Sequence, residues 1–225
     1  MKQFTFLFLF IFASNIIIGQ EVGWQEHPPR QFPRGIVGTG TFDSSIKGSQ
    51  YIDKSYQKVT FLNNQNMVFS GRYNAYSDLI EIIGKTGKKY FTPNKEHPYA
   101  VKFSGTNKIY KAFLITNKKS VFFRILMTNE KITLLAREKI SFSEEFLPQT
   151  GYDRHRPPTF KREKDQYYIY LNNEKKVVSL SIKKDAFLKL FSTNSKTIKK
   201  YILKEKLNIK KEKDLIKIFK FHSSL

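Results

Sequence analysis

Between Tyr51 and Leu180, short runs of β-branched and aromatic residues alternate with turns rich in Asn, Gly and Lys. These runs are 59–62, 79–83, 88–91, 109–115, 121–126, 132–135, 167–171 and 177–180. Asparagine and glycine adopt the positive φ that tight hairpins need, and short strands at regular spacing are typical of antiparallel sheets. We therefore predict a mainly β (α+β) fold, an antiparallel meander forming a sandwich or a small barrel. The run 121–126 is apolar on both faces, which predicts a central strand.

From Lys183 the apolar period becomes helical, with Phe187, Leu188 and Phe191 first and similar groups at 198–202 and 215–219. Residues 183–225 also hold 13 lysines and four acidic residues, a side-chain net charge of +9. We predict two or three short amphipathic helices, and divide the chain into a β-rich domain (51–182) and a lysine-rich helical appendage (183–225). Lysines interleaved with aromatic residues are typical of nucleic-acid and membrane-surface binders. Docking of the apolar stripe onto the β-rich domain explains the same pattern.

The N-terminus has the form of a secretory signal peptide. Lys2 precedes a run of about 12 apolar residues, shorter than the roughly 20 that span a bilayer. Residues 1–19 are therefore predicted to be a signal peptide, either cleaved between Gly19 and Gln20 or retained as an anchor. Residues 20–50, rich in Pro and Gly, are predicted to be an extended lead-in. We expect an exported protein that is periplasmic or extracellular, with peripheral attachment to the outer membrane as one form of this location. We expect no transmembrane span in the mature chain.

The formal net charge of +21 favours anionic partners such as acidic glycans, lipopolysaccharide or nucleic acid. A lysine-rich composition biased by AT-rich coding explains the same charge without any ligand. Export lowers the expectation for nucleic acid and raises it for envelope components. The chain has no cysteine, which excludes disulfides, thiolate metal sites and cysteine nucleophiles.

Two polar groups are candidate ligand-binding residues. Arg72, Tyr73, Asn74 and Tyr76 lie on one predicted strand, where they could form a binding face or serve cross-strand packing and a turn. A second group, Arg154, His155 and Arg156, lies in a long loop predicted between Phe146 and Asp165. Two arginines and a histidine could grip a phosphate or carboxylate, or simply keep an exposed loop soluble.

The sequence contains no pattern that predicts a metal, a cofactor or a catalytic residue. The four histidines are scattered and none has zinc-ligand spacing. Glu144–Glu145 and Asp78 with Glu81 are the carboxylate pairs that a hydrolase would need, although glycosidase chemistry requires a set separation in space.

Residues 71–81, Gly-Arg-Tyr-Asn-Ala-Tyr-Ser-Asp-Leu-Ile-Glu, resemble a strand motif in a family of uncharacterised secreted bacterial proteins. The Gly48-Ser49-x-Tyr51 entry and the lysine-rich tail near 183–221 are similar to that family as well. The resemblance implies an exported β-rich domain with a helical C-terminus and implies no activity.

The sequence thus predicts an exported, non-catalytic binding or scaffold protein of the cell envelope or extracellular space. The alternative is a polyanion-binding protein that uses the basic tail and the 152–156 loop. A hydrolase with a carboxylate pair is a third hypothesis.

Overall fold

The computed structural model describes residues 46–62, 68–84, 87, 89–91, 100–116, 119–149 and 152–225. The predicted signal peptide and most of the predicted lead-in lie outside these residues. Within them the strands are β1 (Gln57–Phe61), β2 (Val68–Asn74), β3 (Leu79–Ile83), β4 (Lys89–Phe91), β5 (Ala100–Phe103), β6 (Lys108–Thr116), β7 (Lys119–Thr128), β8 (Ile132–Arg137), β9 (Ile140–Ser143), β10 (Thr159–Arg162), β11 (Gln166–Leu171) and β12 (Lys176–Ser179).

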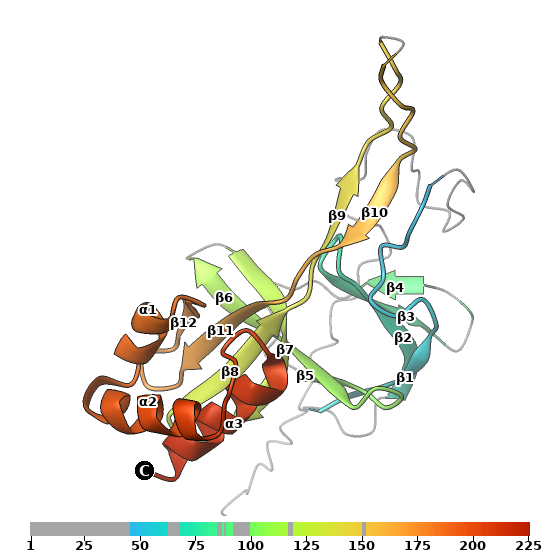
Figure 1. Cartoon of the computed structure of the whole chain (residues 1–225). Coiled ribbons are helices and arrows are strands. Elements are labelled where there is room, and N and C mark those ends of the chain that lie inside the picture. Colours follow the sequence, from blue (N-terminus) through green and yellow to red (C-terminus); the bar gives the residue numbers. More distant parts are fainter. Residues whose placement is uncertain are drawn as a thin grey trace, which may run out of the picture.

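Ten of these strands form one antiparallel sheet with the order β12-β11-β8-β7-β6-β5-β1-β2-β3-β4. Two meanders, β1 to β4 and β5 to β8, are joined where β1 pairs with β5. The sheet curves across the molecule in Figure 1. The predicted mainly β fold with C-terminal helices is confirmed. The small barrel is not formed, because the outermost strands β12 and β4 do not pair with each other among the described residues.

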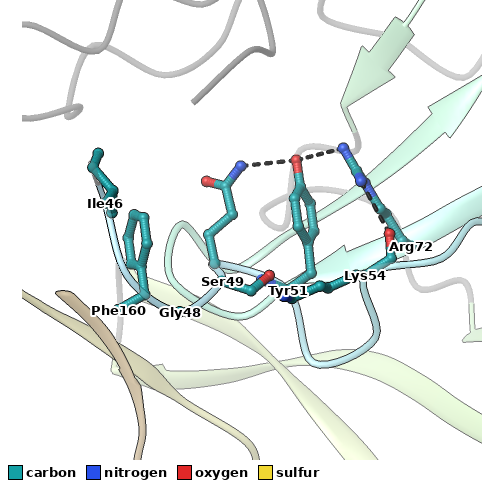
Figure 2. A pocket seen from close by; sticks show the side chains of 8 residues that line it. Ile46, Gly48, Ser49, Tyr51, Lys54, Arg72 and Phe160 are labelled. Carbon is teal, nitrogen blue, oxygen red and sulfur yellow. Dashed lines mark hydrogen bonds between the residues drawn. The ribbon is translucent and has the colours of Figure 1, made fainter. Parts of the chain in front are cut away.

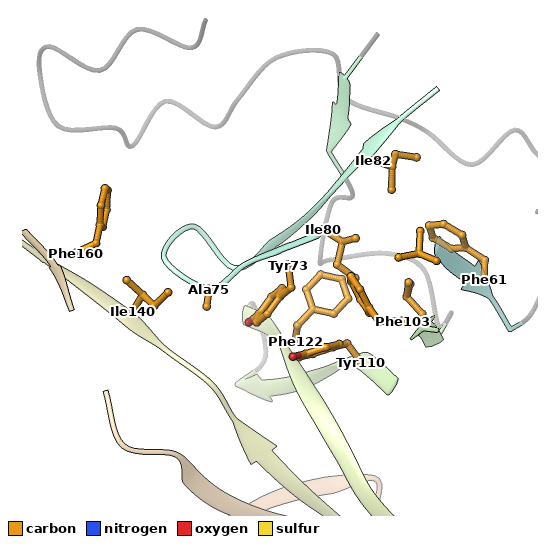
Figure 3. Packing of buried hydrophobic residues seen from close by; sticks show 12 residues of the cluster. Phe61, Tyr73, Ala75, Ile80, Ile82, Phe103, Tyr110, Phe122, Ile140 and Phe160 are labelled. Atoms are coloured by element: carbon orange, nitrogen blue, oxygen red, sulfur yellow. The ribbon is translucent and has the colours of Figure 1, made fainter. Parts of the chain in front are cut away.

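Two clusters of apolar side chains lie on opposite faces of β7. Phe122 points into the first, which also contains Tyr73, Tyr110 and Ile80 (Figure 3). Val121 and Phe123 point into the second, beside residues of β6 and β8. A strand that buries both faces has no solvent side, so the prediction that 121–126 is central is confirmed.

The C-terminal segment packs against the sheet through a third apolar cluster. It contains α1 (Lys184–Lys189), a 3₁₀ turn (Ser192–Asn194), α2 (Ser195–Lys204) and α3 (Glu212–Ser223). Their buried side chains are Phe187, Leu188, Phe191, Ile198, Ile202, Leu215, Ile218 and Phe219, and they share the cluster with Leu134 of β8 and Ile169 of β11. The predicted docking of the apolar stripe is therefore what the structure shows. None of the helices in the described part of the chain is long and apolar enough to cross a membrane.

Strands β9 and β10 form a separate two-stranded hairpin that projects from the body of the protein (Figure 1). The sequence predicted a long loop between Phe146 and Asp165, and this prediction is wrong in part. Thr159 to Arg162 is strand β10, which pairs with β9. Farther along the hairpin, Phe146 and Arg156 form an antiparallel bridge. The nearby prolines and the charged residues of this segment gave no sign of a strand, because β10 is specified by its pairing with β9.

Candidate functional site

Arg72 of β2 is held in a clasp of protein groups (Figure 2). Its guanidinium carbon lies 3.6 Å from the centre of the Tyr51 ring and 4.2 Å from that of Tyr56. Nη2 donates to Oη of Tyr51 at 2.8 Å and to Oε1 of Glu81 at 3.0 Å, and Nη1 donates to the carbonyl of Lys54 at 3.1 Å. Both terminal nitrogens are therefore already bound to the protein, and Arg72 acts as a structural clamp.

Glu81 is the buried anion of this clasp, with 2% of its surface exposed. It accepts hydrogen bonds from Oη of Tyr51 at 2.6 Å and from Oη of Tyr56. Burial raises the pKa of Glu81, while the Tyr51 hydrogen bond and the charge of Lys89 oppose that rise. The ion pair with Arg72 and the hydrogen bonds from the two tyrosine hydroxyls together compensate for the burial of the Glu81 carboxylate. Sequence reasoning singled out Arg72 but missed Tyr56, whose position carries no local signal.

The other residues of the predicted strand face serve the core and a turn. Tyr73 is 3% exposed and its hydroxyl donates to Oδ1 of Asp78 at 2.7 Å. Oδ1 of Asn74 accepts the backbone N–H groups of Tyr76 and Ser77 at 3.2 and 3.0 Å, which orders the β2–β3 turn. Tyr76 packs against the base of the β9–β10 hairpin. These side chains and Arg72 do not form one binding face.

The carboxylates of the predicted Asp78 and Glu81 pair are engaged separately. Asp78 accepts the Tyr73 hydroxyl and the backbone N–H of Phe122, whereas Glu81 belongs to the Arg72 clasp. In the second pair, Oε1 of Glu145 lies 2.8 Å from Nε2 of His155, and Glu144 lines a cavity beside Phe146. Among the described residues, no group of three or more His, Cys, Asp or Glu side chains could hold a metal ion.

Arg154, His155 and Arg156 lie near the tip of the hairpin and are exposed. His155 Nε2 lies 2.8 Å from Oε1 of Glu145. The guanidinium carbon of Arg156 lies 4.4 Å from the centre of the Phe146 ring. In Figure 1 this tip points away from the helices, so the loop and the basic tail do not make one surface.

A cavity of about 220 Å³ lies beside the Arg72 clasp (Figure 2). Its walls are Ile46, Gly48, Ser49, Gln50, Tyr51, Lys54, Arg72 and Phe160. Because the terminal nitrogens of Arg72 already bind Tyr51, Glu81 and the chain at Lys54, the arginine offers this cavity little binding capacity.

The helices present a basic surface opposite their buried side. All 13 lysines between 183 and 225 are exposed. Six of them recur at helical spacing opposite the buried residues, and we name them the lysine face: Lys196, Lys200 and Lys204 of α2, and Lys213, Lys217 and Lys220 of α3. Because the apolar sides of both helices are taken up by the core, the lysine face is turned to solvent.

An ionic network fixes α3 to the sheet behind the lysine face. Arg124 of β7 donates through Nη1 to Glu212, the first residue of α3, at 2.9 Å, and through Nη2 to Asp165 at 3.2 Å. Its Nε lies 3.4 Å from Oε1 of the buried Glu138. Burial acts to lower the pKa of Arg124, but the hydrogen bond to Glu212 and the charge of Glu138 raise it above its ordinary value. An acidic side chain of α3 is thus directed inward, away from the lysines.

Comparison of the chain with protein-family models, curated proteins and solved structures found no match. The resemblance to a family of secreted bacterial proteins therefore stays a prediction, and the function is inferred from the geometry of the described residues.

Proposed function

We propose that this protein is an exported, non-catalytic binding protein that attaches to an acidic glycan of the cell envelope through the lysine face. The observation that supports the proposal is that α2 and α3 each have one buried apolar side and one exposed basic side. Their apolar sides complete the core, and six lysines stand on the opposite sides. Among the described residues, no ion pair joins any of these six to a carboxylate.

The energetics of like charges support a ligand. Lysines four residues apart on a helix repel each other by about 0.2–0.5 kcal/mol per pair. Lys196–Lys200, Lys200–Lys204 and Lys213–Lys217 all have this spacing. A polyanion relieves the repulsion and releases its own condensed counterions on binding, which drives association at low salt.

The same geometry argues against insertion into a bilayer. An interfacial helix buries its apolar side among lipid chains. Here Ile198, Ile202 and Leu215 are buried in the protein core, so insertion would require the domain to open. We choose a glycan over nucleic acid because the predicted signal peptide directs the protein out of the cytoplasm.

Separate engagement of Asp78 and Glu81 supports a non-catalytic role. Hydrolysis by a carboxylate pair needs two groups facing one substrate. Asp78 binds Tyr73 and a β7 backbone N–H, and Glu81 binds the tyrosines and Arg72, so neither is available to act with the other.

The test is binding of a fluorescent heparin oligosaccharide, followed by anisotropy at several salt concentrations. The test variant replaces Lys196, Lys200 and Lys204 by Gln, which has a similar helix propensity. The matched control replaces three exposed lysines of the β region, Lys58, Lys161 and Lys164, by Gln.

We expect the α2 variant to weaken binding strongly and to make the slope of log K against log salt shallower, because fewer lysines then release counterions from the polymer. The control should change the affinity and the slope little. Equal weakening by the two variants would mean that overall charge alone governs binding and would refute the assignment to the lysine face. Stronger binding to single-stranded DNA than to heparin at the same salt would refute the choice of a glycan.

A further inference from the structure

A second cavity, of about 490 Å³, lies along the projecting hairpin. We name it the hairpin groove, and its walls are Lys47, Ser143, Glu144, Phe146, Arg156, Pro157 and Thr159. Sites for small molecules commonly measure about 300–1,000 Å³, so this groove has the size of a ligand site, whereas the cavity beside Arg72 is smaller than that range.

The backbones of the two cationic residues of the groove, Lys47 and Arg156, are held by hydrogen bonds. The N–H of Lys47 donates to the carbonyl of Pro158 at 2.9 Å, which joins the entering chain to β10. Phe146 and Arg156 exchange a pair of backbone hydrogen bonds of 2.8 and 3.0 Å across the hairpin. Gly48, with φ of +85°, lets the chain turn against β10 directly after Lys47. The backbone therefore positions Lys47 and Arg156 on the same groove before any ligand arrives.

The side chains of the groove combine positive charge with apolar surface. The Phe146 ring lies under the guanidinium of Arg156, which orients that planar group. Among the described residues, no ion pair joins a carboxylate to Arg156 or to Lys47. Phe146 and Pro157 supply apolar wall. Glu144 is the acidic member, so the groove carries two positive charges and one negative charge.

We propose that the hairpin groove binds a small molecule that carries one carboxylate on an apolar body. The carboxylate pairs with the Arg156 fork and the Lys47 ammonium, and the apolar body lies against Phe146 and Pro157. Glu144 repels ligands of dense negative charge, which separates this site from the lysine face. The proposal is independent of glycan binding, since the hairpin and the helices point in different directions in Figure 1.

The test is a titration of the full, isotope-labelled chain with benzoate, followed by amide chemical shifts in NMR spectra. Benzamide serves as the neutral probe of the same shape, and acetate as the carboxylate without an aromatic body. We expect benzoate to shift the amides of residues 143–147, Arg156 and Thr159 and to bind about tenfold or more tightly than benzamide, because a hydrogen bond to a charged group is worth about 1.5–3 kcal/mol.

Arg156→Gln and Lys47→Gln should each weaken benzoate binding, whereas Arg154→Gln, an exposed neighbour that does not line the groove, should leave it unchanged. Lys47→Gln also keeps the test valid if Arg156→Gln disturbs the hairpin, since Lys47 is held through its backbone. Equal binding of benzamide, equal weakening by Arg154→Gln, or shifts confined to α2 and α3 would each overturn the proposal.

Discussion

Replacing Ile198 by Ala tests whether the helices are part of the domain core. Ile198 of α2 is fully buried, in the cluster that also contains Leu134 of β8 and Ile169 of β11. Truncating a buried Ile to Ala costs about 2–5 kcal/mol, through the lost transfer energy and the cavity left behind. A domain of this size is stable by only about 5–15 kcal/mol, so the loss is a large fraction of the total.

The measurement is urea unfolding followed by circular dichroism. With a slope of about 2 kcal/mol per molar urea, the midpoint should fall by about 1–2.5 M. Leu203→Ala is the matched control, because Leu203 lies on the same helix with 57% of its surface exposed. It should change stability by no more than about 0.5 kcal/mol.

Hydrogen exchange then shows where the loss is felt. If the helices and the sheet share one core, Ile198→Ala should reduce protection in β8 and β11 together with α1 to α3. Faster exchange limited to 183–225, with β8 and β11 unchanged, would refute the shared core and would make the helices an independently melting appendage.

Three other outcomes follow from the structure. Arg124→Met removes the partner of Glu212, whereas Glu138 keeps Lys108 and Arg162, and Asp165 keeps Arg162. The change should cost about 1–3 kcal/mol in urea unfolding, and a loss below about 0.5 kcal/mol would show that the network is solvated. Burial raises the pKa of Tyr51 and of Tyr110, so the folded state holds these protons more tightly than the unfolded state. The resulting stability is fully present below the ordinary tyrosine pKa of about 10 and should decline as the pH rises above that value. The decline in the free energy of unfolding should be shallower in Tyr110→Phe. Gly48 and Gly87 have φ of +85° and +78°, but a Cβ at Gly48 would lie 2.1 Å from a β10 carbonyl oxygen while one at Gly87 meets nothing within 4 Å. Thermal unfolding should therefore show Gly87→Ala costing about 1–2 kcal/mol and Gly48→Ala clearly more, and equal costs would contradict the packing at Gly48.

The parts of the fold that local sequence predicts are those set by neighbouring residues. The turn 172–175 links β11 and β12 as expected, because its Asn residues favour the tight connection and its flanking strands carry Tyr, Ile and Val. The run Val121-Phe122-Phe123 predicts a central strand since no face of it can be left in water. The helices after Lys183 can likewise be predicted locally, because helical periodicity is recognised from apolar residues three or four positions apart.

What the sequence did not predict depends on distant partners. Strand β10 reads Thr-Phe-Lys-Arg, which has no strong alternation, and it is ordered by pairing with β9 and by the bridge to Lys47. The pairing of β1 with β5 passes over three intervening strands, so nothing local distinguishes an open sheet from a barrel.

The candidate site shows the same limit. Arg72 was recognisable as a polar residue on a strand. Its partners are Tyr51, Tyr56 and Glu81, which the chain brings together only through the sheet register. Whether a strand arginine is available to a ligand or clasped by the protein therefore depends on interactions that spacing does not reveal. The lysine face could be predicted as an amphipathic pattern, and its orientation followed once the apolar side was known to be buried.

Because the inner sides of α2 and α3 are fixed in the core, the backbone positions of the lysines on the lysine face have fixed spacings. Along α2, Lys196, Lys200 and Lys204 are separated by four residues each, a rise of about 6 Å per step. A disordered basic tail would adjust its charges to any polymer, but these positions cannot move apart or together without disturbing the core. A polymer whose anionic groups repeat near that interval can contact successive lysines without bending. A polymer with a different repeat loses this match after a few of its repeating units.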